Sequence, residues 1–380
     1  VKLHNGIDER AVRVIRRLQR AGYGAFLVGG CVRDMLMGRQ IHDYDAATSA
    51  LPEQVTALFE NTVPTGIRHG TVTVWVDGLG VEVTTFRSES VYTDGRHPDA
   101  VRFERSIETD LSRRDFTVNA MALSADGEII DIFGGRADIE GRIIRTVGDP
   151  AERFGEDALR MYRCVRFAAV LGFEIDGGAL RAMKSRAPLR GSVSRERIRE
   201  EIEKTLMSPR PHLLETAAWA GLLDKKGTAS AGRLGDLPEN RFSRWGGFFA
   251  WLGDENADLR LDKRLKAAVT AGLELCGTVT DRLSVKKIIA RRGYDVAYAA
   301  CGAAQVLGAE DAGALPEEIL ASGECCTVSE LAVKGADLVS IGFEPGKRIG
   351  QVLEKLLDMV LLEPEKNSRE ALLDSARQML

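Results

Sequence analysis

The sequence LVGGCVRD at residues 27–34, followed by DYD at residues 43–45, decides the fold of the N-terminal part of the chain. A short apolar run that leads into two glycines and then into a helical pattern predicts a strand, a tight turn and the start of a helix. Glycines at such a turn let backbone N–H groups approach a phosphate closely. Arg33 adds a charged donor on the same helix, so this stretch predicts a phosphate-binding turn at Gly30 and Arg33.

Two carboxylates follow the turn. Asp43 and Asp45 alternate along a predicted strand over residues 43–47, so both are expected on one face. Like charges on one face repel each other unless a cation lies between them. Mg²⁺ prefers oxygen ligands and commonly bridges carboxylates to substrate phosphates. Asp43 and Asp45 are therefore predicted to be catalytic metal ligands, and the alternative is a pair of exposed surface acids. Glu82 is either a third ligand or an exposed sheet residue.

The surrounding pattern predicts an α+β head with a small mixed sheet. Apolar runs at residues 25–28, 71–75 and 81–86 are predicted strands, and the turn Asp77-Gly78 joins the last two. Adjacent strands with a tight turn argue against a doubly wound parallel sheet. The polar residues 88–99 are predicted to form a mobile loop.

Helical periodicity dominates the rest of the chain. Gly and Pro interrupt it from residue 149 onward, and the polar residues 225–239 predict a long loop. The expected organisation is a mixed α/β head followed by a helical neck, a helical body and a helical tail of two or three helices. Their predicted ranges are 1–150, 151–212, 213–325 and 326–380.

Composition limits the class of protein. The 380 residues are 44% hydrophobic and 28% charged with a net charge of −4, which excludes a fully disordered chain. No run approaches the ~20 apolar residues of a membrane helix, and no secretory signal is visible. The six cysteines form no C-x-x-C pair, which is typical of reduced thiols in a cytoplasmic protein and argues against structural zinc. Residues 151–212 carry 13 Lys/Arg and 9 Asp/Glu, so a basic surface is local.

Two further motifs are rich in arginine. RRDFTVNAM at residues 113–121 places Arg114 for triphosphate or ribose contacts, and the alternative is a solvated basic turn. Residues 156–167 predict one helix with an apolar stripe on the packing face and Glu156, Arg160 and Arg163 opposite it. The alternative there is a surface helix stabilised by ion pairs of ~0.2–0.5 kcal/mol each. The stripe consists of Ala158, Tyr162, Val165 and Ala169.

These motifs, in this order over roughly the first 210 residues, resemble the class II tRNA nucleotidyltransferases, the CCA-adding enzymes of the polymerase-beta-like superfamily. The resemblance implies a palm-like catalytic head followed by an all-helical neck with a base-recognition helix, a helical body, and a helical tail that contacts tRNA. It implies that the tRNA 3′-hydroxyl attacks CTP or ATP with two Mg²⁺ ions held by Asp43 and Asp45, releasing pyrophosphate. It places nucleotide binding at Gly30, Arg33, Arg114, Asp157, Arg160, Arg163 and Arg166.

The residues of the base site suit such a reaction. Cytosine and adenine both present an amine donor beside an unprotonated ring nitrogen. Asp157 can accept from the amine and Arg160 can donate to the ring nitrogen. Uracil and guanine would leave both protein groups unpaired, which rejects a ligand strongly. One Asp–Arg pair is therefore predicted to select C and A without a nucleic-acid template.

Several alternatives remain at this point. A full-length segment at residues 92–99 disfavours a CC-only enzyme, and a tail of mixed charge disfavours a poly(A) polymerase, while an A-only enzyme stays open. A non-catalytic RNA-binding relative would have lost a carboxylate or the Glu156-Asp157-x-x-Arg160 pattern, and both are intact. Expected partners are the tRNA 3′ end with CTP and ATP, and no membrane. The oligomeric state is left open, with a homodimer as one option.

Overall fold

The computed structural model describes residues 6–66, 70–89, 101–104, 106–254 and 257–380. The chain forms two compact units: unit 1 contains residues 1–201 and 216–223, and unit 2 contains residues 202–215 and 224–380. The finer division at residues 150, 212 and 325 stays a prediction. Most of the predicted loop at residues 88–99 lies outside the described residues.

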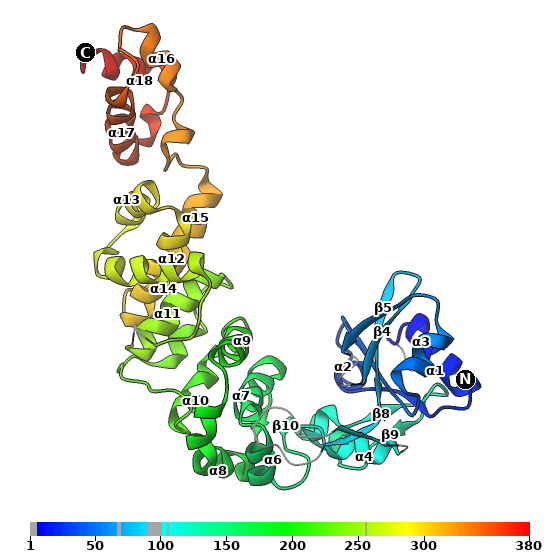
Figure 1. Cartoon of the computed structure of the whole chain (residues 1–380). Coiled ribbons are helices and arrows are strands. Elements are labelled where there is room, and N and C mark those ends of the chain that lie inside the picture. The colour runs from blue at the N-terminus through cyan, green and yellow to red at the C-terminus, as the bar shows by residue number, and fades with distance from the viewer. Residues whose placement is uncertain (1–5, 67–69, 90–100, 105, 255–256) are drawn as a thin grey trace. The chain divides into compact units, whose positions relative to one another are not determined.

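Unit 1 is built on a seven-stranded mixed sheet (Figure 1) with the strand order β3-β4-β5-β2-β1-β8-β9. Only β2 and β5 pair in parallel; the other neighbours are antiparallel. The predicted small mixed sheet is thus confirmed. Its strands are β1 (Ala25–Val28), β2 (Tyr44–Thr48), β3 (Thr62–Gly66), β4 (Thr71–Val76), β5 (Leu79–Thr85), β8 (Ala122–Leu123) and β9 (Ile129–Ile130).

Helices pack on both faces of this sheet. On one face, apolar side chains of α1 such as Ile15 form a core with Leu27 of β1 and Val83 of β5. On the other, Leu111 of α4 packs against Val28 and neighbouring apolar residues. The helices of the head are α1 (Glu9–Arg20), α2 (Gly30–Leu36), α3 (Pro52–Leu58), α4 (Ile107–Ser112) and α5 (Gly135–Gly141).

The predicted turn between β4 and β5 is present in the structure. Asp77 and Gly78, which join β4 to β5, both have positive φ (47° and 79°), as a two-residue hairpin turn with the right twist requires. Two short ladders lie outside the main sheet. β6 (Arg87–Glu89) pairs antiparallel with β7 (Val101–Phe103), and β10 (Ile143–Ile144) pairs in parallel with β11 (Glu174–Ile175).

The segment that follows the head is helical but is not built as the periodicity predicted. Asp149 caps α6 (Pro150–Glu156), which begins with proline, and this helix ends at Glu156. Asp157 is extended, and a separate helix, α7 (Leu159–Leu171), follows. The predicted single helix over 156–167 is therefore wrong at its start. Further helices here are α8 (Gly177–Arg186), α9 (Arg195–Leu206) and α10 (Leu214–Trp219).

The predicted apolar stripe of α7 is buried, as expected, but so is part of the opposite face. Tyr162, Val165 and Ala169 are inaccessible, and Arg160 is only 8% exposed. A surface helix held by exposed ion pairs does not bury an arginine in this way. The polar face of α7 is therefore a contact face inside unit 1.

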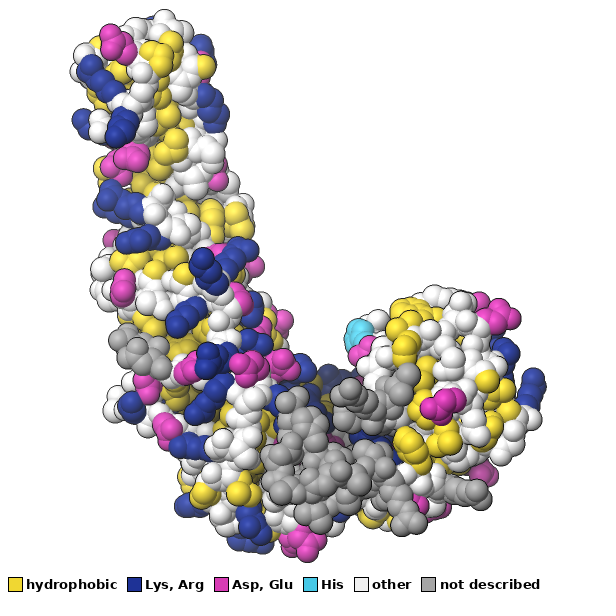
Figure 2. Space-filling model, in the orientation of Figure 1, with side chains coloured by type: hydrophobic (Ala, Val, Ile, Leu, Met, Phe, Trp, Pro, Cys, Tyr) yellow, Lys and Arg dark blue, Asp and Glu magenta, His cyan; other side chains and the backbone are white. Residues whose placement is uncertain are grey.

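In the described residues of unit 2, the regular secondary structure is helical. Small residues let α11 and α14 approach each other closely: a Cβ added to Gly302 would lie 2.2 Å from the carbonyl oxygen of Ser243. On the face shown in Figure 2, Lys and Arg side chains of unit 2 alternate with acidic and hydrophobic ones. The helices are α11 (Arg241–Leu252), α12 (Lys263–Leu275), α13 (Arg282–Arg292), α14 (Tyr294–Leu307), α15 (Leu315–Ser322), α16 (Gly335–Ser340), α17 (Lys347–Leu362) and α18 (Arg369–Arg377).

The last three of these helices confirm the predicted helical tail, and the stretch from 225 to 239 is a long loop with one short 3₁₀ turn. All six cysteines are free thiols. Among the described residues, no helix is long and apolar enough to cross a membrane.

Candidate active site

The predicted turn forms where β1 ends. Val28 pairs with Asp45 in the antiparallel register of β1 and β2, so the carboxylate lies beside the residue that precedes Gly29. Gly29 has φ 74° and ψ −133°, a conformation that suits glycine alone. A Cβ at Gly29 would lie 2.9 Å from Nη1 of Arg114 and 3.7 Å from Oδ2 of Asp45. The turn thus brings a carboxylate and a guanidinium together from segments that are far apart in the sequence.

Three carboxylates influence one another at this edge of the sheet. Asp45 lies on β2, Asp43 immediately precedes that strand, and Glu82 is the partner of Asp45 on the parallel strand β5. Burial raises the pKa of Asp45, and the charges of Glu82 and Asp43 raise it further, while Arg114 opposes the shift. A bound cation would relieve this repulsion.

The donor set fits a hard divalent cation. Carboxylate oxygens are the ligands that Mg²⁺ prefers, and it usually keeps waters and substrate phosphates in its shell. Within the described part of the chain, no three His, Cys, Asp or Glu side chains gather to hold a metal by themselves. A site of this kind would therefore take its remaining ligands from water and substrate.

Arg114 is held by a buried acid that the sequence analysis did not single out. Asp110 of α4, whose side chain is 1% exposed, accepts hydrogen bonds from Arg113 (2.6 Å) and Arg114 (3.1 Å). Burial raises the pKa of Asp110, but the charges of Arg114 and Arg113 outweigh burial and hold it below its ordinary value. The spacing of three and four residues on a helix was the available signal.

Arg33 is anchored on both sides. It forms an ion pair with Asp34 (2.9 Å), and its Nη1 donates to Oδ1 of Asn119 at 2.6 Å. Asn119 in turn donates to Asp115 at 3.4 Å. The side chain is only 9% exposed, so the predicted triphosphate contact would have to use the donors that these partners leave.

Arg163 and Arg166 are bound by carboxylates inside unit 1. Arg163 donates to Asp115 from Nε (2.8 Å) and Nη2 (2.6 Å), and Arg166 donates to Glu201 of α9. Both guanidinium groups, with that of Arg33, lie within 5.5 Å of the centre of the Phe167 ring. These arginines join α2, α7 and α9, and their predicted nucleotide contacts stay a prediction.

The charge of Arg163 also explains how Asp115 can be buried. Burial alone raises the pKa of the Asp115 carboxyl, but Arg163 outweighs it and holds that pKa below its ordinary value. Asp115 therefore orients Arg163, whereas Arg114 is oriented by Asp110.

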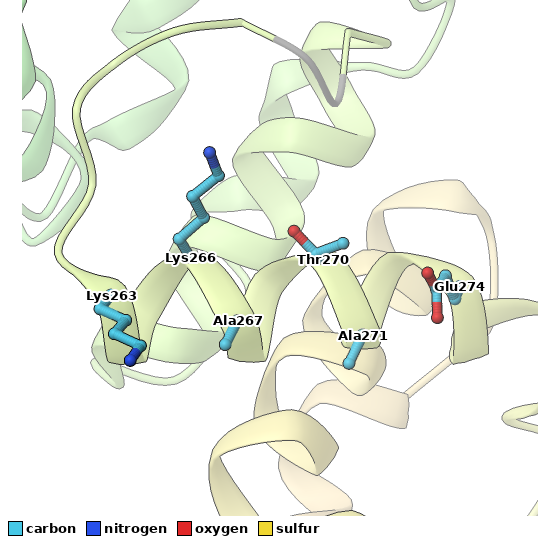
Figure 3. Close-up of a pocket in the computed structure, with 6 residues that line it drawn as sticks. All are labelled: Lys263, Lys266, Ala267, Thr270, Ala271 and Glu274. Atoms are coloured by element: carbon cyan, nitrogen blue, oxygen red, sulfur yellow. The ribbon is translucent and has the colours of Figure 1, made fainter.

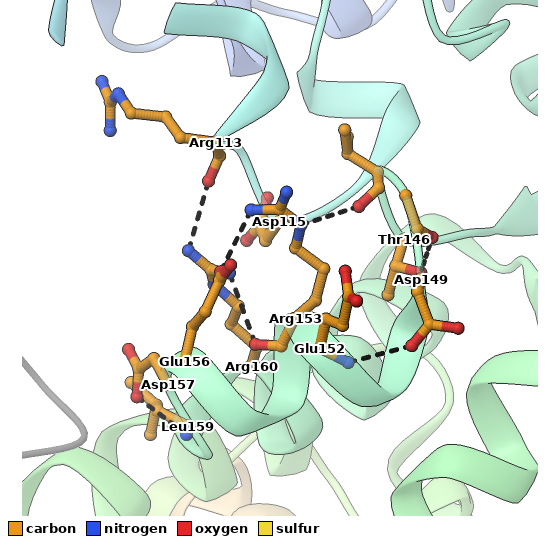
Figure 4. Close-up of polar contacts among 12 residues, drawn as sticks. Arg113, Asp115, Thr146, Asp149, Glu152, Arg153, Glu156, Asp157, Leu159 and Arg160 are labelled. Carbon is orange, nitrogen blue, oxygen red and sulfur yellow. Dashed lines mark hydrogen bonds and ion pairs between the residues drawn. The ribbon is translucent and has the colours of Figure 1, made fainter. Parts of the chain in front are cut away.

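The base-reading pair predicted from the sequence is present, with partners of its own (Figure 4). Asp157 accepts from the backbone N–H of Leu159, the first residue of α7, at 3.0 Å, and from Nη2 of Arg197 at 2.8 Å. Arg160 is bound by Glu156, which also accepts from Arg153 at 3.0 Å. The side chains of Asp157 and Arg160 therefore each bind other groups, which leaves each with unused acceptor or donor positions.

A hydrogen bond connects this pair to the head. Nη2 of Arg160 donates to the carbonyl oxygen of Arg113 at 3.2 Å, next to Arg114. The structure thus brings the predicted base-reading segment, the arginine motif and the glycine turn into one region of unit 1. Sequence reasoning missed Asp110 despite its spacing to the two arginines. It missed Arg197 and Glu201 because each is identified only by its partner in space.

A separate hollow of about 400 Å³ lies along α12 of unit 2 (Figure 3). It is an open depression on one helix face and contains none of the predicted site residues. Its lining consists of Lys263, Lys266, Ala267, Thr270, Ala271 and Glu274.

Comparisons with known families and proteins cover most of the chain. Residues 25–145 match the family described as poly A polymerase head domain, residues 172–225 the probable RNA and SrmB-binding site of polymerase A, and residues 256–376 the putative tRNA nucleotidyltransferase domain 2. The CCA-adding enzyme of Limosilactobacillus fermentum is 38% identical, covering 98% of this chain and 97% of that protein. That of Lactiplantibacillus plantarum is 39% identical, covering 98% and 96%.

Solved structures agree with these matches. The crystal structure of the Bacillus stearothermophilus CCA-adding enzyme in complex with CTP has a TM-score of 0.78 and 34% identity, covering 98% of both chains. The Thermotoga maritima CCA-adding enzyme complexed with tRNA has a TM-score of 0.73 over 99% of this chain and 97% of its own, and at 19% identity it supports the fold alone.

Proposed function

This chain belongs to the CCA-adding enzymes, which are tRNA nucleotidyltransferases, and we propose that the region around Gly29 is its active site. The reaction is the addition of C, C and A to the 3′ end of tRNA from CTP and ATP, with release of pyrophosphate. The Bacillus relative was solved with CTP. The observation that carries the site proposal is the convergence of Asp45 and Arg114 on the glycine turn.

The fold uses a divalent cation, and we propose Mg²⁺ held by Asp43 and Asp45. Such an ion lowers the pKa of the attacking hydroxyl and neutralises charge on the pyrophosphate. Asp45 is fixed by the β1–β2 register, and Asp43 lies one residue before the strand, where it is exposed. The rigid strand would hold one carboxylate in place while the exposed one adapts to the incoming triphosphate.

In this proposal, arginine side chains make the remaining contacts to the charged nucleotide. Arg114, held by Asp110 beside the glycine turn, is placed to contact the sugar or phosphates. Arg33 and the backbone of Gly30 would contact the triphosphate. Asp157 accepts from the amine of cytosine or adenine and Arg160 donates to the ring nitrogen, so that the protein itself selects the base.

The metal proposal is tested by Asp43→Ala and Asp45→Ala. Each purified variant is given tRNAs that end before, within and after CCA, with CTP or ATP supplied singly and together in Mg²⁺. We expect both variants to lose nucleotide addition while tRNA affinity stays largely unchanged. Glu53→Ala, an exposed acid elsewhere in the head, is the matched control and should keep wild-type rates. Substantial turnover by a folded Asp45→Ala protein would remove this residue from the metal site.

The same assay separates the full activity from its partial forms. The wild-type chain should extend a tRNA lacking CCA by two residues with CTP alone and complete it when ATP is added. It should also add A to a tRNA that ends in CC and leave a complete tRNA unchanged. Long A tracts on any acceptor would indicate poly(A) synthesis instead.

A further inference from the structure

We propose that Arg197 is a positioning residue for nucleotide selection, because it fixes the orientation of the Asp157 carboxylate. The proposal rests on the base-reading role given above to Asp157. It adds a residue of α9, 40 positions further along the chain, that no local sequence motif connects to base recognition.

The contacts hold both oxygens of Asp157. Oδ1 accepts from the backbone N–H of Leu159 (3.0 Å), and Oδ2 accepts from Nη2 of Arg197 (2.8 Å). The side chains of Arg197 and Asp157 are 24% and 14% exposed, so water competes little for this ion pair. A charge-assisted bond at such a place is stronger and more directional than a surface ion pair.

Two fixed points define the plane of a carboxylate. An ionised carboxylate offers about four acceptor positions, and the two bonds above use one on each oxygen. The remaining positions therefore point in set directions. Without Arg197, one contact at Oδ1 remains, and the group can turn about its Cβ–Cγ bond, because this torsion has a broad energy well.

Selection of C and A needs the acceptor and the donor side by side. Arg160 is held separately, by Glu156 and by the carbonyl oxygen of Arg113, so its position does not depend on Arg197. Loss of Arg197 should therefore disturb the acceptor and leave the donor in place. The expected result is weaker discrimination against UTP and GTP, whose carbonyls Asp157 would otherwise reject.

The fold should tolerate the substitution. Nη1 of Arg197 is buried without a hydrogen-bond partner among the described residues, and an unpaired buried donor is unfavourable. Replacing the side chain removes this unfavourable group together with the ion pair, so the two effects on the stability of the fold oppose each other.

The test compares Arg197→Ala, Arg197→Lys and Asp157→Ala in the full chain. Incorporation of all four nucleotides is measured as kcat/KM on a tRNA lacking CCA, with Arg195→Ala on the same helix as the control, because Arg195 is exposed. Arg197→Ala should lower the CTP/UTP and ATP/GTP ratios by about tenfold or more, the change that corresponds to ~1.4 kcal/mol. Arg197→Lys should restore part of the ratio, and thermal unfolding should show all variants folded.

A double variant distinguishes positioning from a general structural effect. If Arg197 acts through Asp157, adding Arg197→Ala to Asp157→Ala should not lower discrimination further. Wild-type ratios in Arg197→Ala, or an undiminished further loss in the double variant, would overturn the proposal. If Asp157→Ala itself keeps full discrimination, the base-reading role fails as well; if only Arg197→Ala does, that role stands.

Discussion

Asp110 is the residue on which the arginine motif depends. One buried carboxylate accepts from both Arg113 and Arg114. Breaking a buried ion pair by removing one charge typically costs about 3–5 kcal/mol, because the partner charges stay buried. Asp110→Asn should lower the free energy of unfolding by about that amount and release Arg114 from its place beside Gly29. Urea denaturation and nucleotide addition would measure the two effects.

The control for that experiment is Glu108→Gln, an exposed acid on the same helix. Its effect on stability should stay within ~0.5 kcal/mol, as for most surface substitutions. Equal stability of the Asp110 and Glu108 variants would show that the arginines are held by other groups.

Glu324 gives unit 2 a pH-dependent contribution to stability. Hydrogen bonds from Lys286 and Arg282 lower the pKa of Glu324 to about 2, from an ordinary value of 4.5. Because the pKa of Glu324 is lower in the folded chain than its ordinary value, the ionised carboxylate stabilises the fold at pH values above 4.5. This contribution to stability is lost as the pH falls from 4.5 toward 2. The stability difference between wild type and Glu324→Gln should therefore shrink by ~1 kcal/mol between pH 7 and pH 4. Urea unfolding at both pH values measures it, and a constant difference would contradict the role of this ion pair.

Residues of the site differ in how visible they were in the sequence. Asp45 stands in a short D-x-D motif and Arg114 in a pair of adjacent arginines, so local sequence pointed to both as candidates. Arg197 contacts Asp157 from 40 residues away, and only tertiary structure reveals such a pair. The partners of Arg163 and Arg166 were hidden for the same reason, since an arginine in a helix looks the same whether it faces solvent or a buried carboxylate.

At the scale of the element, strands and turns were easier to predict than helix boundaries. The β4–β5 hairpin was predictable because Asp77-Gly78 specifies its turn. The break between α6 and α7 was not, because periodicity over residues 156–167 continues across it. Asp157 follows the end of α6, and its side chain accepts from the backbone N–H of Leu159, the first residue of α7, a contact that a count of apolar spacings cannot detect.

The packing of α11 against α14 depends on glycine. In an exposed helix, Gly→Ala stabilises by about 0.5–1 kcal/mol. At Gly302 the new methyl group would meet the backbone of Ser243 at 2.2 Å, so Gly302→Ala should instead lower the free energy of unfolding, by about 1–3 kcal/mol. Gly350→Ala in α17, where nothing lies within 4 Å of the added Cβ, is the matched control and should stabilise. Chemical denaturation of both variants checks the sign, and two equal shifts would contradict the close contact.

At the scale of the whole molecule, the chain crosses between its two units near residues 201, 215 and 223. Composition suggests a linear division at residues 150, 212 and 325. Gly, Pro and polar runs mark the loops of a chain, but they do not show which units the loops connect. Gly221 marks a turn within residues 216–223, but such a mark does not reveal that these residues return to unit 1. Their return is visible only through contacts, such as that of the Tyr162 hydroxyl with the carbonyl oxygen of Leu222 at 2.8 Å.

These contacts predict how the chain can be cut. Residues 216–223 add to unit 1 the buried Leu222 and a hydrogen bond from Arg190 to the carbonyl oxygen of Gly221 at 2.7 Å. Burial of one leucine contributes about 1.5–3 kcal/mol. A fragment that ends at residue 201 should therefore unfold about 5–10 °C below one that ends at residue 223, since each kcal/mol shifts the midpoint by ~2–4 °C at this size.

Thermal unfolding followed by circular dichroism compares the two fragments, and Leu222→Ala in the longer fragment is the companion variant. Because Leu222 is 2% exposed, its substitution should lower the free energy of unfolding by about 2–5 kcal/mol. The variant should therefore reproduce much of the difference in midpoint between the two fragments. Equal midpoints for both fragments and for the variant would mean that residues 216–223 lie on unit 1 without stabilising it. Unit 1 would then fold from its first 201 residues alone, and the return of the chain would serve only to connect the units.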